Sequence, residues 1–278
     1  MAGDDDAPSP SARVPSAALR AAVEAMYDVF GHYRRARPLN VCRCPVCVAP
    51  EAEEALSTTP LRQISGAVMG QYTASAHGYD EVVDGDTFRH FLPRYCDLIA
   101  RGDAPDTFGE VHFCLSRLGT AAYRTAWPAR EAEAVDRFFE AILRDVLADG
   151  RTERYPARVA PLTDAASYLI MIARAGGDIA RALGVLDQAA DPAAAMHIAE
   201  MAVDVSSGPE GYFFKTPLID ADSPLARALG AWIARPEVLA RLQAAFFAAP
   251  DDAMQSVISL GVDTLSVWPE LAKAHTAG

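Results

Sequence analysis

The stretch GDTFRHFLPRYCDLIARG, residues 85–102, shows most clearly which class of fold the chain adopts. Its large apolar residues recur every three or four positions, which is the spacing of one face of an α-helix. These residues are Phe88, Phe91, Leu92, Tyr95, Leu98 and Ile99. Asp86 is placed to cap the start of this helix, and Pro93 is expected to kink or restart it. The stretch therefore predicts an amphipathic helix.

The same pattern begins near the N-terminus. Ser16 follows Pro15 and predicts a helix N-cap, after which Leu19, Val23 and Met26 lie on one face of a helix that reaches about residue 35. Residues 1–15 are acidic, rich in Pro and Ser and without hydrophobic period, so they predict a disordered tail. Thr59 and Pro60 predict a further helix start within TTPLRQI.

Helical periodicity continues through the rest of the chain, with Pro, Asp, Ser or Thr at many starts and Gly at several ends. The predicted helices cover residues 107–125, 128–148, 162–175, 177–189, 191–205, 223–234, 236–248 and 251–267. GYFFKTPLI, residues 211–219, is the nearest candidate for a strand, but we expect an extended loop because no partner strand is evident. The sequence predicts an all-α fold, with residues 16–278 forming one domain.

Two helical architectures fit this pattern. The pentapeptide ARALG occurs at residues 180–184 and again at 226–230, a separation that suits a short HEAT-like array. Met196 and Met254, in neighbouring similar segments, give a different separation, and alanine-rich helices produce such matches easily. The expected fold is therefore an irregular multi-helix bundle or a short HEAT-like array.

Composition limits the classes of function. The chain has 278 residues, a hydrophobic content of 51% and a formal charge of -12. An acidic surface repels nucleic acid and anionic membranes, so neither is an expected partner. The sequence shows neither a secretory signal nor an apolar run long enough for a membrane span, which predicts a cytoplasmic protein.

Three of the five cysteines lie within VCRCPVCV, residues 41–48, in a proline-containing connection that spans residues 37–58. The spacing of Cys44 and Cys47 lets both thiolates reach one tetrahedral ion, and Cys42 can supply a third ligand. We predict that Cys42, Cys44 and Cys47 bind a structural zinc ion that stabilises this connection. The candidates for the fourth ligand are His32, His77, His90 and Cys96.

Other interpretations of the cluster remain open. The Cys-Pro-Val-Cys segment is also typical of a redox dithiol, although the strand and helix that usually activate such a thiol are not predicted here. The three thiols could equally bind nothing and pack against their neighbours. Cys96 and Cys114 lie in apolar helical patterns and are predicted to be small buried hydrophobic residues.

Two sets of polar residues share a helical face. His197, Glu200 and Asp204 have the spacing of the Glu-x-x-His units of di-iron bundles, but the chain has no second such unit. A solvated polar face is therefore the preferred interpretation. The same interpretation applies to Asp86, His90 and Asp97.

Several motifs together resemble a family of uncharacterised bacterial all-helical proteins. They are the CPxC cluster after a first helix, TPLRQIS at residues 59–65, DTFRHFLPRY at residues 86–95, and Trp127-Pro128 before a Phe-rich helix. The resemblance covers about residues 26–148. It implies a helical fold and a bacterial cytoplasmic origin, implies that Cys42 is dispensable, and supplies no known activity.

These observations favour a non-enzymatic helical interaction or scaffold protein that carries a structural zinc site and binds a protein partner. The alternative is an enzyme, either a thiol-redox protein or a metal-dependent one, that uses Cys42, Cys44 and Cys47. No catalytic triad or phosphate-binding loop is evident in the sequence.

Overall fold

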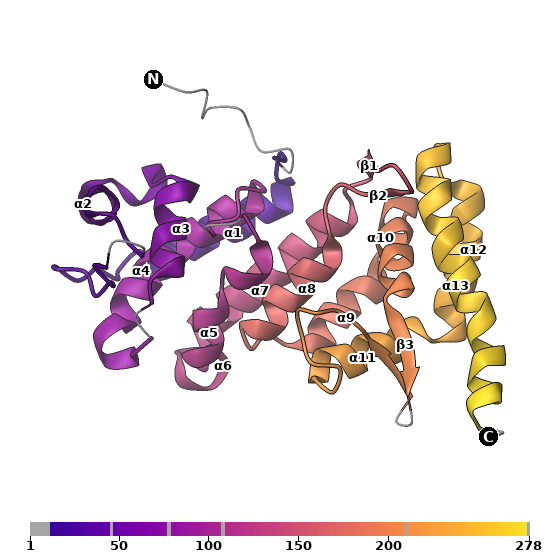
Figure 1. Cartoon of the computed structure of the whole chain (residues 1–278). Coiled ribbons are helices and arrows are strands. Elements are labelled where there is room, and N and C mark those ends of the chain that lie inside the picture. The colour runs from indigo at the N-terminus through magenta and orange to yellow at the C-terminus, as the bar shows by residue number, and fades with distance from the viewer. Residues whose placement is uncertain (1–11, 45–46, 77–78, 107–108, 209–210, 277–278) are drawn as a thin grey trace. The chain divides into compact units, whose positions relative to one another are not determined.

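The chain folds almost entirely into α-helices, as predicted (Figure 1). The computed structural model describes residues 12–44, 47–76, 79–106, 109–208 and 211–276, with the backbone alone for residues 268–276. The fold divides into two compact units, one formed by residues up to 142 with 174–177 and the other by residues 143–173 with 178–278. The expectation of a single domain over residues 16–278 stays a prediction. None of the helices in the described ranges has the length and apolar character needed to span a membrane.

The first unit is built around one long, buried helix. Its elements are α1 (Ala17–Phe30), α2 (Pro50–Thr58), η1 (Leu61–Gln63), α3 (Gly66–Ala74), α4 (Glu81–Ala100), η2 (Val111–Phe113), α5 (Ser116–Thr120), α6 (Tyr123–Ala126) and the first part of α7 (Ala129–Leu147). Helix α1 packs along α4. Rings of Phe30, Phe88, Tyr123 and Trp127 meet edge to face in the core of this unit.

Helix α4 contains the stretch that predicted the fold class, and all six residues of its apolar stripe are buried. Two details differ from the prediction. The helix begins at Glu81 because the Asp80 carboxylate accepts hydrogen bonds from the backbone N–H groups of Val82 and Val83, so Asp86 is not the cap. It also continues through Pro93 as a single element, so the proline does not restart it.

The segments around α4 depart further from the predicted boundaries. Ser16 caps α1 as predicted, through its hydroxyl and Leu19 N–H, but the helix ends at Phe30. Residues 37–58, predicted to be a connection, contain α2, which starts with Pro50 at its first position. TTPLRQI forms only the short turn η1, and α3 begins after the Ser65 cap.

The predicted N-terminal tail lies mostly outside the described residues. Arg13 belongs to it and is held against the end of α4, where its backbone N–H donates to Arg101 O at 3.0 Å. Its guanidinium donates to the carbonyl oxygens of Ile99 and Ala100. Hydrogen-bonded structure therefore begins before Ser16.

The second unit contains the most accurately predicted helices. Its elements are the end of α7, β1 (Thr152–Arg154), β2 (Val159–Pro161), α8 (Ala165–Arg174), α9 (Ile179–Gln188), α10 (Pro192–Val203), β3 (Val205–Gly208), β4 (Gly211–Phe214), α11 (Pro224–Ile233), α12 (Pro236–Ala248) and α13 (Asp252–Thr276). Helix α10 packs against α12 and α13, as Figure 1 shows, and α11 packs against β4. The predicted helix over residues 107–125 is replaced by η2, α5 and α6 in the first unit.

The prediction that GYFFKTPLI has no partner strand was wrong. Its first residues form β4, which pairs antiparallel with β3, placing Val205 opposite Phe214 and Gly208 opposite Gly211. The partner strand is polar and directly precedes β4, so it lacks the alternating apolar pattern by which strands are recognised. Strands β1 and β2 form a second antiparallel pair.

Candidate metal centre

The cysteine cluster lies on the segment between α1 and α2. Leu39, Val41 and Val48, which flank the cysteines, are each at most 4% exposed and anchor the segment to the first unit. Between these anchors Cys42, Cys44 and Cys47 are all half-buried. The local sequence thus places apolar anchors on both sides of the thiols.

Hydrogen bonds also hold this segment in place. Cys42 N–H donates to Ser75 Oγ at 3.0 Å, and Ala49 N–H donates to Gln71 Oε1 at 2.9 Å. The Arg43 guanidinium pairs with the Glu53 carboxylate of α2 at 2.6 Å. The expectation that this connection has no other support is therefore wrong, because α2, α3 and the buried anchors also hold it.

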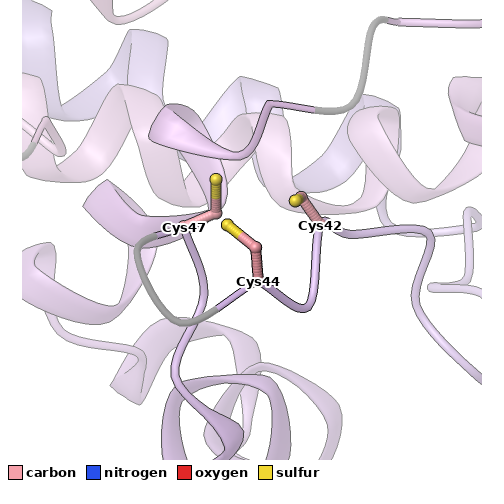
Figure 2. A group of neighbouring side chains, drawn as sticks. All are labelled: Cys42, Cys44 and Cys47. Carbon is pink, nitrogen blue, oxygen red and sulfur yellow. The ribbon is translucent and has the colours of Figure 1, made fainter.

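The three thiols nevertheless converge. The sulfur atoms of Cys42, Cys44 and Cys47 all lie within 4.8 Å of one another, and Figure 2 shows the side chains extending from one loop into the same space. Cys47 N–H donates to Cys44 O at 3.3 Å, and this hydrogen bond brings Cys44 and Cys47 close together. Pro45 and Val46, at the centre of this turn, lie outside the described residues.

The thiols influence one another electrostatically. Hydrogen bonding with Cys44 is the largest cause of a raised pKa at the Cys47 thiol, and Cys42 acts in the same direction. The backbone of Ala76 hydrogen-bonds the Cys47 sulfur and opposes this effect. A raised pKa disfavours the thiolate that redox chemistry requires, whereas a bound cation favours thiolates on all three residues.

The structure separates most candidates for a fourth ligand from the cluster. Within the described ranges, Cys42, Cys44 and Cys47 form the one group of three or more side chains able to share a metal ion. His32 contacts Val29 O, and His90 contacts Tyr33 O through Nδ1, each at 3.1 Å. Cys96 does not belong to the group, and His77 lies outside the described residues.

Segment 75–76 was missed by the sequence analysis. Ser75 Oγ and the backbone of Ala76 contact Cys42 and Cys47, although they are far from the cluster in the sequence. No motif marks them, because a serine hydroxyl and a backbone amide carry no pattern of their own. This contact brings residues 75 and 76, which follow α3, to the edge of the thiol cluster.

The remaining cysteines behave as predicted. Cys96 and Cys114 are 1% and 4% exposed, and burial raises the pKa of both thiols. Neither lies with the cluster. They pack as small apolar side chains and are not candidates for the site.

The predicted solvated faces were wrong at two positions. His197 is 1% exposed and Asp97 is 7% exposed, so both polar side chains are buried within their units. Helical spacing identifies which residues share a face, but whether that face meets water depends on the elements that pack against it. For His197 these include the β1–β2 hairpin, which the sequence analysis did not predict.

The fold and the site together define an all-helical protein with a convergent three-cysteine cluster. Comparison of the chain with protein-family models, curated proteins and solved structures finds no match. The resemblance to bacterial helical proteins therefore stays a prediction, and function is inferred from the geometry of the site.

Proposed function

We propose that Cys42, Cys44 and Cys47 bind a structural zinc ion in a helical protein that acts by binding a protein partner rather than by catalysis. The observation that carries the metal site is the convergence of three sulfur atoms within 4.8 Å of one another. Tetrahedral zinc with Zn–S bonds of about 2.3 Å holds its sulfur ligands about 3.8 Å apart. Small side-chain rotations of the three half-buried cysteines bring their sulfur atoms to this separation.

Zinc at this position would fix the loop of residues 42–47, which already contacts a segment that is distant in the sequence. The three ligands lie between α1 and α2, and Cys42 and Cys47 already contact segment 75–76, which follows α3. A fourth ligand from the protein closes the coordination sphere and makes the site structural, whereas a water ligand leaves an open position for chemistry. The fourth ligand therefore distinguishes the interaction protein from the metal-dependent enzyme.

Metal analysis of untagged protein tests the proposal. We expect about one equivalent of zinc per chain in the wild type and less than about a tenth in Cys47→Ser, because thiolate ligands dominate zinc affinity. Cys114→Ala is the matched control, since its buried thiol lies outside the cluster, and it should keep the zinc. X-ray absorption of the zinc-bound protein should show three sulfur neighbours around the metal. The zinc content of His77→Ala tests whether His77 supplies the fourth ligand.

Two results would contradict the proposal. One is freshly purified protein with negligible zinc, in which the thiols of Cys42, Cys44 and Cys47 all titrate freely while Cys96 and Cys114 stay buried. The other is a reversible disulfide among the three clustered thiols, with a Cys47→Ser variant that folds as well as the wild type; this would establish the redox alternative. Both measurements use the full chain.

A further inference from the structure

Helices α12 and α13 share an exposed groove on their surface. The two helices pack side by side in the second unit, as Figure 1 shows, and both contact α10. The groove has a volume of about 360 Å³ and is lined by Gln243, Phe246 and Phe247 of α12 and by Ser259 and Val262 of α13. All five of these side chains are uncharged. A groove of this composition on the surface of a protein indicates contact with another molecule.

Phe247 projects from the edge of this groove. It is 84% exposed, whereas its neighbour Phe246 is half-buried and meets it edge to face, with 5.3 Å between the ring centroids. A phenyl ring in water is unfavourable, and its burial against another apolar surface recovers that free energy. One patch therefore combines a projecting ring with a hollow beside it.

The surroundings of the groove carry little charge. Residues 242–250 and 253–262 contain no Asp, Glu, Lys or Arg, although 22% of the whole sequence is charged. Asp251 and Asp252 lie between these segments, where Asp251 accepts from Met254 N–H at the start of α13. Two copies of a chain with a charge of -12 repel each other, and they can approach most closely where charge is lacking. A strongly charged partner would find no ion pair within the groove.

The chain itself offers no segment that suits the groove. The longest stretch outside the described residues is 1–11, MAGDDDAPSPS, which has three acidic residues and Met1 as its one large apolar side chain. A small apolar molecule in the groove would leave most of the Phe247 ring in water. A second copy of the chain supplies both a ring to fill the groove and a groove to cover the ring.

We propose that two copies of the chain associate through this face about a two-fold axis, with α12 packed against α12. The same patch serves both copies in a two-fold interface, so a projecting group and a hollow on one patch are filled reciprocally. Phe247 of each copy enters the groove of the other and contacts Phe246 and Val262 there. The inference goes beyond the proposed zinc site, concerns the other unit and does not depend on that site.

The size of the face sets the expected strength of the dimer. Helix α12 has 13 residues and is therefore about 20 Å long. A contact of this length lies at the small end of specific protein interfaces, where association is weak and reversible. We therefore expect a dimer with a Kd of about 1–100 µM.

Sedimentation equilibrium of the full chain measures this association, with a reductant present to prevent disulfides between copies. We expect a monomer–dimer equilibrium that tightens as NaCl rises from about 50 to about 500 mM, because salt screens the repulsion between two acidic chains. A monomer at every concentration up to about 300 µM would overturn the proposal. So would association that continues past the dimer, or a dimer that salt weakens.

Substitutions locate the interface. Phe247→Glu places two like charges in the contact and removes both rings, so it should raise the Kd at least about tenfold. The exposure of Phe247 predicts that this variant keeps the helical circular dichroism of the wild type. Val82→Glu is the matched control, because it adds the same charge at an apolar residue of the first unit that is 96% exposed, and it should leave the Kd unchanged. A dimer that persists in Phe247→Glu, or that Val82→Glu weakens equally, would refute the assignment.

Discussion

Asp97 shows how a buried charge is accommodated within the first unit. Its carboxylate pairs with Arg94 at 2.5 Å and with Arg101 at 2.8 Å, and its side chain is 10% exposed. Tyr27 O–H lies 3.5 Å from the same carboxylate. Removing the charge would leave the Arg94 guanidinium, whose side chain is 11% exposed, without its counterion, which is costly where little water reaches the charge.

Asp97→Asn should therefore lower the free energy of unfolding by about 2–3 kcal/mol. The control is Glu24→Gln, which breaks the exposed pair with Arg62, whose side chains are 58% and 52% exposed. We expect the control to cost less than about 1 kcal/mol, because solvent screens such pairs. Urea denaturation measures both values, and equal losses would show that burial does not strengthen the Asp97 interaction.

The pentapeptide ARALG occurs in two helices whose surroundings differ. ARALG ends at Gly184 in α9 and at Gly230 in α11. A Cβ on Gly230 would lie 2.3 Å from Phe213 Cα of β4, whereas a Cβ on Gly184 would meet nothing within 4 Å. The same local sequence is therefore constrained in one helix by close packing and unconstrained in the other.

Alanine at the two positions should have opposite effects. Gly230→Ala should lower the free energy of unfolding by about 2–3 kcal/mol, because α11 and β4 would have to move apart. Gly184→Ala should raise it by about 0.5–1 kcal/mol, because alanine reduces the entropy of the unfolded chain. Thermal and urea unfolding of the two variants provide the comparison, and a stable Gly230→Ala protein would contradict the close contact.

The helices of the second unit could be predicted from periodicity and caps, with Asp178, Asp191 and Ser223 each capping as their sequence context indicates. The strands could not be predicted from periodicity, because β1 and β3 are short and polar. They are extended because each pairs with the next strand in the chain. The cysteine cluster was recognisable from spacing alone. Its contacts with segment 75–76 and the burial of His197 depend on tertiary packing, which local sequence does not encode.

In the first unit, five tyrosines have pKa values above their ordinary value. Burial is the largest cause for each of Tyr27, Tyr33, Tyr72, Tyr79 and Tyr95, and the pKa of Tyr33 and of Tyr72 is raised to about 12. An unfolded chain loses these protons near pH 10. The folded state therefore binds more protons than the unfolded state at alkaline pH.

Stability should accordingly be fully present below about pH 10 and fall as the pH rises toward about 12, because the unfolded state gains from ionising first. The urea midpoint, followed by circular dichroism, measures this loss, and tyrosinate absorbance shows whether ionisation accompanies unfolding. Tyr72→Phe removes one buried titrating group and should reduce the alkaline loss. A midpoint independent of pH across this range would show that these phenols ionise freely in the native protein.

The division into units has a consequence for how such a protein could arise. Helix α7 passes from the first unit into the second without an end, and residues 174–177, which return to the first unit, are flanked by the second. The return is tight, since a Cβ on Gly119 would lie 2.3 Å from the carbonyl oxygen of Arg174. No single break in the chain yields either unit whole. Joining two ancestral genes end to end would not reproduce this arrangement, so the two units are expected to have been inherited together.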